Sequence, residues 1–248
     1  MNPIVESLNQ RKSVRVYENK PISEYEKQII FNAAIQAPTA GNMTLYTILD
    51  ITDSAIKEKL SVSCDNQPFI ATAPLVLIFC ADYYRWYRMF KRHVHPLRAP
   101  AEGDLILANA DAIIAAQNAV VAAESLGIGS CYIGDIVEHY EFHRELLQLP
   151  DYVFPACMVC FGYPTQQQKE RVKPTRFQIS EIVHENGYQL GKADKMENML
   201  ISRNEITEPE LADWVNKFCQ RKWNSDFSVE MSRSCREIIS SWCKKEDS

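Results

Sequence analysis

One long stretch of alanine and branched aliphatic residues limits the folds open to this chain more than any other feature. From Leu105 to Leu126 the chain contains eight Ala, eight Leu, Ile or Val, and no Gly, Pro or Lys. Alanine is the residue that costs the least free energy to place in a helix. The stretch therefore predicts one long helix.

Apolar residues lie nearly all the way round this predicted helix, which indicates a helix that protein covers on every side. Asp111, Gln117, Asn118 and Glu124 interrupt the stretch. A membrane span needs about 20 predominantly apolar residues, so these interruptions argue against one. We therefore expect the core helix of a soluble protein, whose small alanines also allow a close helix pair or a dimer seam.

A short strand is predicted directly after the helix. Gly127 ends the helix, as a glycine just past the last turn commonly does. Ser130 to Ile133 is typical of a buried strand, and Gly134 and Asp135 follow at its end. Because glycine has no side chain, a flat ligand can approach the backbone there.

Composition and charge exclude some classes of function. The chain has 248 residues, 46% hydrophobic and 24% charged, which suits one large globular domain or one domain with an appendage. Its net charge of −5 argues against nucleic acid as the main partner. The first ten residues lack a basic leader and an apolar core, so we expect a cytoplasmic protein with reduced cysteines.

The CxxC spacing of Cys157 and Cys160 does not predict a metal site or a disulfide. Both residues lie in one apolar run that is typical of a strand, where positions three apart point to opposite faces. We therefore expect them to be apolar fillers, and we predict no metal.

Helices and strands alternate along the rest of the chain. Asn2 before Pro3 predicts a helix start, and so does the Ser23–Glu26 capping box. Helices are predicted at residues 3–10, 24–37, 54–60, 138–147, 207–217 and 228–242, and strands at 47–52, 74–81, 130–133 and 155–162. Residues 83–100 carry many aromatic and basic side chains without a clear period, and for them we predict a mobile cover over a site.

Two basic clusters are the first chemical signal. Arg11, Lys12, Ser13 and Arg15 put three cations and a hydroxyl directly after a helix, and guanidinium groups match phosphate oxygens well. On base rates alone, a solvated charge run is the more frequent reading of such a cluster. The second cluster contains Lys169, Arg171, Lys173 and Arg176.

Two loops can bring hydrogen-bonding groups to a ligand without bulk, at residues 38–42 and 65–69. The sequence shows no catalytic triad, paired-carboxylate arrangement, GxGxxG or P-loop. An anion clamp, amide-bearing loops and a Gly-Asp at a strand end remain. Such a set can bind a phosphorylated planar cofactor that brings its own reactivity.

Five ordered motifs together resemble the nitroreductase family of FMN-dependent oxidoreductases. They are RKSVR at 11–15, APTAGN at 37–42, AQNAVVAAESLGIGSCYIGD at 116–135, FGYP at 161–164 and VKP at 172–174. The longer tail is most similar to the oxygen-insensitive major nitroreductase and NADPH-flavin reductase branch. The resemblance favours the phosphate-binding interpretation of the first cluster.

The resemblance implies a set of cofactor-binding residues. Arg11, Lys12, Ser13 and Arg15 would hold the FMN phosphate and ribityl chain, with Lys173 and Arg176 on the phosphate side. Gln67 would hydrogen-bond to the pyrimidine edge, and the backbone from Tyr132 through Ile133 and Gly134 to Asp135 would lie along the ring. Thr39, Gly41 and Asn42 would reach the flavin of the partner subunit.

The family also implies a fold and an assembly. We expect an α+β protein with a mixed, mainly antiparallel sheet wrapped by helices, and with the long helix at the interface of a homodimer. Residues 1–190 would form the FMN-binding domain, and residues 191–248 a helical extension that packs on the dimer.

The implied reaction is a ping-pong cycle in which NADPH or NADH gives a hydride to flavin N5 and a small planar acceptor then takes it. Nitroaromatics, quinones and free flavins are the acceptor classes. No side chain acts as a nucleophile. Two alternatives are a protein that stores FMN without turnover and a structural dimer that binds no flavin.

Overall fold

The computed structural model describes residues 2–243, and its centre is a four-stranded sheet. The strands are β1 (Tyr46–Asp50), β2 (Leu75–Asp82), β3 (Gly129–Ile133) and β4 (Val153–Gly162). Their order is β1-β2-β4-β3, and all neighbouring strands are antiparallel. Among the described residues the parallel part of the expected mixed sheet is an isolated bridge between Ser13 and Ser130. The predicted α+β class is confirmed.

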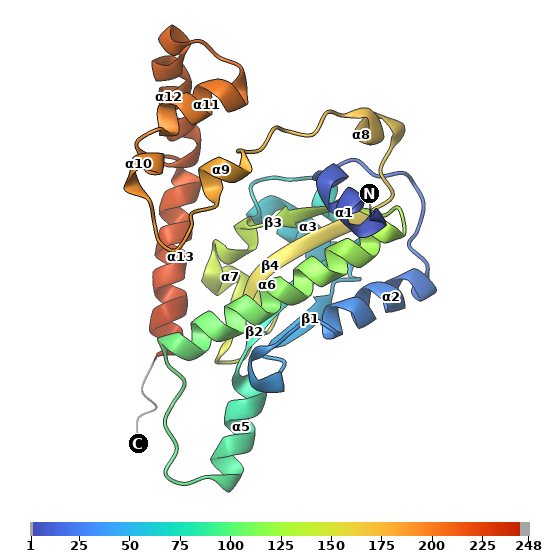
Figure 1. The fold of residues 1–248 in the computed structure, drawn as a ribbon. Helices are drawn as coiled ribbons and strands as arrows, with labels where there is room; N and C mark the ends of the chain where they lie inside the picture. Colours follow the sequence, from blue (N-terminus) through green and yellow to red (C-terminus); the bar gives the residue numbers. More distant parts are fainter. Residues whose placement is uncertain (1, 244–248) are drawn as a thin grey trace. The chain divides into compact units, whose positions relative to one another are not determined.

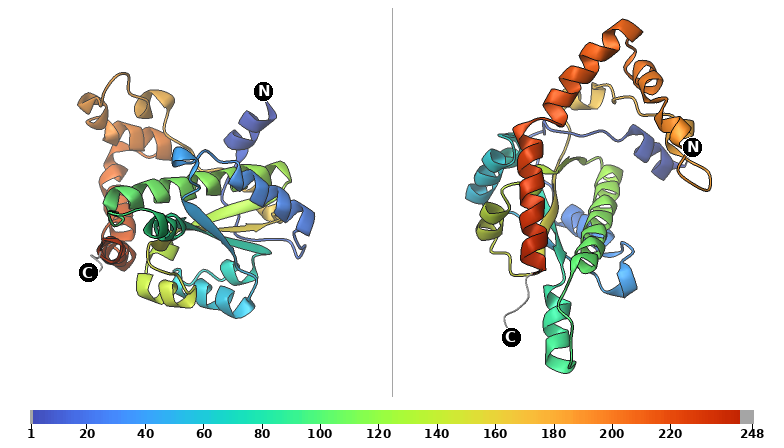
Figure 2. Two further views of the ribbon diagram at one scale, coloured as in Figure 1. Left: turned by 90° about the horizontal axis from the view of Figure 1, so that it is seen from below. Right: turned by 90° about the vertical axis from the view of Figure 1, so that its left-hand side faces the viewer.

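Helices cover both faces of this sheet (Figures 1 and 2). Helices α2 (Glu24–Ile35) and α6 (Glu102–Ser125) lie on one face, and α3 (Ser54–Ser63) and α7 (Tyr140–Leu146) lie on the other. Every residue of β2 and β4 is buried. The continuous apolar runs that predicted these strands therefore have a physical reason, because both of their faces are withdrawn from water.

The remaining elements are short or lie near the ends of the chain. They are α1 (Pro3–Gln10), η1 (Ala40–Asn42), α4 (Phe69–Thr72), α5 (Tyr84–His93), η2 (Asp135–Val137) and α8 (Gln166–Glu170), followed by α9 (Ile179–Ile182), α10 (Leu190–Ala193), α11 (Met196–Asn204), α12 (Glu208–Lys222) and α13 (Asp226–Trp242).

Helix α6 packs on the sheet through a row of alanines. Ala108, Ala112, Ala115 and Ala119 are fully buried, and such small side chains let the helix backbone approach its neighbours closely. The helix is long and apolar enough to pass a test for a membrane span by length and composition, but 44% of that apolar window is buried inside the protein. Its buried face contacts the sheet, which is the behaviour of a core helix.

The expectation that protein covers α6 on every side is wrong for the single chain. Ile106 is 67% exposed, Leu107 48%, Ile113 42% and Ile114 39%. These residues recur at helical spacing and form one face, which we call the open face of α6. A helix that is apolar all round can be covered by its own chain or by another chain, and the sequence pattern does not show which.

The predicted capping residues of α1 and α2 are confirmed, and one segment differs from its prediction. Asn2 caps α1 through a hydrogen bond from Ile4 N of 2.9 Å, and the capping box of α2 is formed by Ser23 and Glu26. Residues 84–93 form helix α5, where the sequence predicted irregular cover. Tyr87 is the buried residue of this helix, and Arg85 donates to Tyr46 O at 2.6 Å, while Arg88 and Arg92 are exposed.

Residues 11–17 run in extended form against the edge of the sheet. Val14 N donates to Ser130 O at 2.9 Å, and Glu18 N donates to Tyr163 O at 2.8 Å. Two glycines make this approach possible. A Cβ at Gly129 would lie 2.5 Å from Val14 Cγ2, and one at Gly162 would lie 2.5 Å from Tyr17 Cδ1.

The chain divides into two compact units. The first comprises Met1–Arg171 together with Glu230–Ser248, and the second comprises Val172–Val229. The second unit contains α9 to α12, and within it α11 contacts α12. The functional division that the sequence suggested at residue 190 stays a prediction.

Cys157 and Cys160 belong to different hydrophobic clusters, one on each face of the sheet. The predicted opposite orientation of the two side chains is confirmed. Burial raises the pKa of the Cys157 thiol to about 12, so it is an apolar filler at neutral pH.

We predict that Gly162→Ala destabilises the protein by about 1–3 kcal/mol, because the new methyl group overlaps the Tyr17 ring and Pro74. Urea denaturation measures the effect. Gly103→Ala is the matched control, since a Cβ there meets nothing within 4 Å and α6 gains a better helix former. Equal denaturation midpoints for the Gly162 variant and the wild type would show that the extended segment does not constrain the sheet edge.

Candidate cofactor site

A group of cations lies at one end of β3. The Arg11 guanidinium donates from Nη2 to Ser130 Oγ at 3.4 Å and lies 5.8 Å from the centre of the Tyr132 ring. Its Nε is buried and has no hydrogen-bond partner among the described residues. A buried guanidinium N–H without an acceptor is costly, so this position fits an anionic ligand.

Lys12 and Arg171 connect the first basic cluster to the second. Lys12 Nζ donates to Lys169 O at 2.7 Å and also to Arg171 O, and Arg171 donates to Ser13 O. Arg15 N donates to Gln168 Oε1 at 3.3 Å. The structure therefore brings residues 11–15 and 168–171 together, and in this arrangement the Lys12 ammonium serves as a clamp between the segments.

Glu124 of α6 is the acid beside this cluster. Burial raises the pKa of its carboxyl, and the positive charge of Arg11 opposes that rise. Its Oε1 is buried without a hydrogen-bond partner in the part of the chain that the structure describes. No strong ion pair within the described chain therefore occupies the guanidinium N–H donors of Arg11.

Strand β3 leads from the cations to a second polar group. The strand continues from Ser130 to Ile133, roughly 10 Å of extended chain, and Gly134 and Asp135 follow at its end. Gly134 is exposed, and a Cβ built on it would meet nothing within 4 Å. The backbone at Gly134 therefore has free space beside it, and its use by a flat ligand stays a prediction.

Gln67 lies beside this strand end. Its Nε2 donates to Asp135 Oδ2 at 3.0 Å and to Cys64 O at 2.9 Å. Both amide N–H groups are thus used within the protein, which fixes the orientation of the side chain. The amide carbonyl is left as an acceptor for an N–H of a ligand, because none of the described residues donates to it.

The loop at residues 39–42 is held by a buried carboxylate. Asp111 of α6 is 4% exposed, and it accepts hydrogen bonds from Ala40 N at 3.1 Å, from Leu45 N at 3.2 Å and from the Thr39 hydroxyl. Gly41 and Asn42 both have positive φ, at 55° and 59°. Glycine and asparagine tolerate that region best, which explains their place in this turn.

This loop and the cation cluster lie at different positions along α6. Asp111 anchors the loop and Glu124 lies beside Arg11, and these two residues are thirteen positions apart, roughly 20 Å along the helix axis. Thr39, Gly41 and Asn42 therefore do not join Arg11 in one site within a single chain.

Lys173 and Arg176 belong to the second compact unit. Arg176 Nη1 donates to Pro174 O at 3.5 Å within that unit. Their predicted part in phosphate binding stays a prediction.

Sequence reasoning missed several residues of the site. Ser130 and Gln168 contact the cation cluster, and Asp111 holds the loop. Asp111 gave a visible signal, a carboxylate inside an apolar helix. Ser130 and Gln168 are ordinary polar residues whose place depends on the path of residues 11–17 along the sheet edge.

Taken together, the residues fit a ligand with an anionic end and a flat polar end. The donors at Arg11 suit a phosphate, the open backbone at Gly134 suits a planar ring, and Gln67 offers an oriented acceptor. The described residues of this site include no serine, cysteine or lysine placed as a nucleophile beside a base. Chemistry at such a site has to come from the bound group.

Comparison with known proteins agrees with this interpretation. The model of the nitroreductase family matches residues 8–163. A Cr(VI) reductase from Pseudomonas sp. (strain G-1) is 33% identical over 236 residues, which is 93% of each chain. An FMN reductase [NAD(P)H] from Bacillus subtilis (strain 168) is 29% identical over 94% of this chain and 90% of its own.

A solved structure is similar over nearly the whole chain. The NADPH:FMN oxidoreductase from Vibrio harveyi complexed with NAD+ superposes with a TM-score of 0.77 at 25% sequence identity, covering 96% of this chain and 98% of the other.

We predict that Asp111→Asn loosens the loop at residues 39–45. An amide accepts fewer hydrogen bonds than a carboxylate and leaves buried donors unsatisfied, at a cost of about 1–3 kcal/mol. Amide hydrogen exchange at Ala40 and Leu45 should accelerate, while exchange within β4 stays slow. Asp53→Asn, at an exposed cap of α3, is the control. Unchanged protection of both amides would show that Asp111 does not hold the loop.

Proposed function

The chain belongs to the nitroreductase family, and on that premise we propose that it reduces nitroaromatics, quinones or free flavins by a ping-pong hydride transfer. It is an NAD(P)H-dependent oxidoreductase with FMN as its cofactor. The acceptor classes and the ping-pong order of steps are what we propose. A cytoplasmic location stays a prediction.

The arrangement along β3 is the observation that carries the proposal. A half-buried guanidinium group with a buried, unused Nε–H lies at one end, and an amide with an unused carbonyl lies at the other. The open backbone at Gly134 lies between them. The polar groups of FMN have the same order, from phosphate to ring to pyrimidine edge.

Each predicted residue has a part in this proposal. Arg11, Ser13 and Arg15 bind the phosphate and ribityl chain, and Lys12 holds the segment against residues 169–171. Lys173 and Arg176 add positive charge on the phosphate side. Gln67 accepts from the ring N–H, and the backbone of residues 132–135 supports the ring.

When bound, FMN supplies hydride transfer at its N5 atom. The chain itself orients the ring through the strand end, offers backbone N–H donors near Asp135, and places cations that favour negative charge on the ligand. Because these groups are fixed before a ligand arrives, they stabilise developing charge without reorganisation. No covalent step by a side chain is needed.

A homodimer completes the proposed site. The open face of α6 is apolar, and a second copy of the chain would cover it. Thr39, Gly41 and Asn42 lie about 20 Å along α6 from Arg11 in one chain. In the dimer they reach the flavin of the partner, which is their proposed role.

Replacing Arg11 tests the phosphate end of the site. Arg11→Ala should weaken FMN binding about 10- to 100-fold, because charge-assisted hydrogen bonds are lost. Fluorescence titration of the FMN-free protein measures the dissociation constant. Arg92→Ala removes an exposed cation of α5 and is the control. If the two variants bind FMN equally well, the cation cluster is not the phosphate site.

A charge on the open face tests the dimer. Ile113→Glu should produce monomers in analytical ultracentrifugation, because a buried unpaired carboxylate opposes association. Val62→Glu places the same charge on the exposed side of α3 and should leave the dimer intact. A monomeric wild type, or an Ile113 variant that remains dimeric, would contradict the proposed interface.

A further inference from the structure

Glu138 is a buried acid that the site described so far does not use. It follows η2 directly, its residue is 5% exposed, and its Oε1 has no hydrogen-bond partner among residues 2–243. Buried carboxyl groups are normally paired with a cation or fully hydrogen-bonded. This one is placed among other acids.

The titratable groups around Glu138 come from each element beside it. They are Asp65 after α3, Asp135 of η2, His139 and His143 at α7, and Glu230 of α13. Burial lowers the pKa of His143, so its ring is neutral at pH 7. No cation of the described chain forms an ion pair with Glu138.

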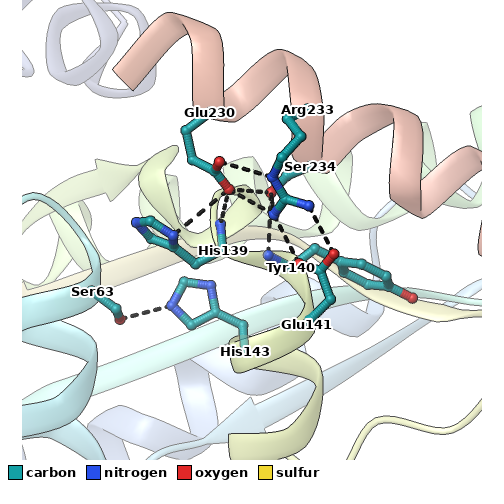
Figure 3. A network of polar contacts seen from close by, with 8 residues as sticks. All are labelled: Ser63, His139, Tyr140, Glu141, His143, Glu230, Arg233 and Ser234. Carbon is teal, nitrogen blue, oxygen red and sulfur yellow. Dashed lines mark hydrogen bonds and ion pairs between the residues drawn. The ribbon is translucent and has the colours of Figure 1, made fainter. Parts of the chain in front are cut away.

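Arg233 is engaged by other acids, as Figure 3 shows. Arg233 of α13 donates to both carboxylate oxygens of Glu141 at 2.8 Å and to Glu230 at 2.8 Å and 2.9 Å. Glu230 in turn accepts from His139 N at 3.0 Å. This network joins α13 to α7 and leaves Glu138 without a counterion.

The surroundings of Glu138 favour its neutral form. Burial is the largest cause, and the negative charges of Asp135, Asp65 and Glu230 add to it, so that the pKa of the Glu138 carboxyl rises to about 7. A carboxyl with such a pKa carries a proton in a large fraction of molecules at neutral pH and can also release it.

Asp135 connects Glu138 to the cofactor site. Its carboxylate is half-buried, lies beside Glu138, and accepts from Gln67 Nε2 at 3.0 Å. Both Gln67 and Asp135 lie at the strand end that is proposed to support the flavin ring. A path of polar groups therefore leads from a buried acid to the edge of the site.

We propose that Glu138 and Asp135 share one proton and that this pair supplies the proton consumed when an acceptor is reduced. The inference rests on the proposed function. A quinone that accepts a hydride derived from NAD(P)H still needs one proton to become a hydroquinone. Glu138 passes the one shared proton to Asp135, and Asp135 gives that same proton to the quinone oxygen as the new O–H bond forms.

Repulsion between the two carboxylates then restores the singly protonated pair. After the transfer both carboxyl groups are ionised, and two adjacent buried carboxylates repel each other. The pair therefore takes up one proton from water before the next turnover. Asp135 touches the acceptor in this scheme, and Glu138 acts through Asp135 as a proton reservoir.

The first test detects the protonated carboxyl group directly and needs no cofactor. Infrared spectroscopy of the FMN-free protein should show a protonated carboxyl band that titrates near pH 7. Glu138→Gln should remove this band, and Glu145→Gln, which changes an exposed acid of α7, should retain it. Asp135→Asn should shift the titration to lower pH, because a neighbouring negative charge is removed.

The second test follows the reaction. In stopped-flow mixing of the NADPH-reduced, FMN-loaded protein with benzoquinone, the wild-type rate should fall tenfold per pH unit above about pH 7. Glu138→Gln should lower the rate about 100-fold below pH 7 and remove this dependence. Glu138→Asp should restore a titrating rate, and Glu145→Gln should behave as the wild type.

The outcomes separate the two proposals. A band that survives in Glu138→Gln, or a pH profile that this variant shares with the wild type, overturns the proton pair. Failure of the wild type to bind FMN contradicts the proposed function instead, and the infrared titration then remains the test of the shared proton.

Discussion

Close packing of one alanine-rich helix against a fully buried sheet is the constraint on which this structure depends. The alanines of α6 bring its axis near β2 and β4, and the same helix fixes two functional groups at separate points. Asp111 holds the loop at residues 39–42, and Glu124 lies beside Arg11. Because a helix is stiff, the distance between loop and cations is set by the number of residues between them.

Much of the fold could be predicted because its signals are local. Continuous apolar runs gave β2 and β4, and capping residues located the starts of α1 and α2. Two features depend on contacts that no local pattern encodes. The helix at 84–93 mixes aromatic and basic residues, so its sequence does not show that Tyr87 reaches the core, and the open face of α6 is apolar like the buried face.

Some residues of the site could likewise be predicted from local motifs, and others could not. Arg11, Ser13, Gln67 and Gly134 were predicted from motifs, and the structure places them along one strand and its end. The acids were harder to find. Asp111 and Glu138 matter through burial and neighbours, and an isolated Asp or Glu in a sequence is far more often a solvated surface residue. Their environment comes from residues between 39 and 230, which only the tertiary structure brings together.

The central claim is that this chain binds FMN and passes electrons from a nicotinamide to a second substrate through one site. An anaerobic absorption spectrum of the FMN-loaded protein tests it most directly. The account predicts that one equivalent of NADPH or NADH bleaches the flavin bands without any acceptor present, and that a quinone added afterwards restores them. Flavin bands that NAD(P)H leaves unchanged would indicate a protein that stores FMN, and would contradict the account.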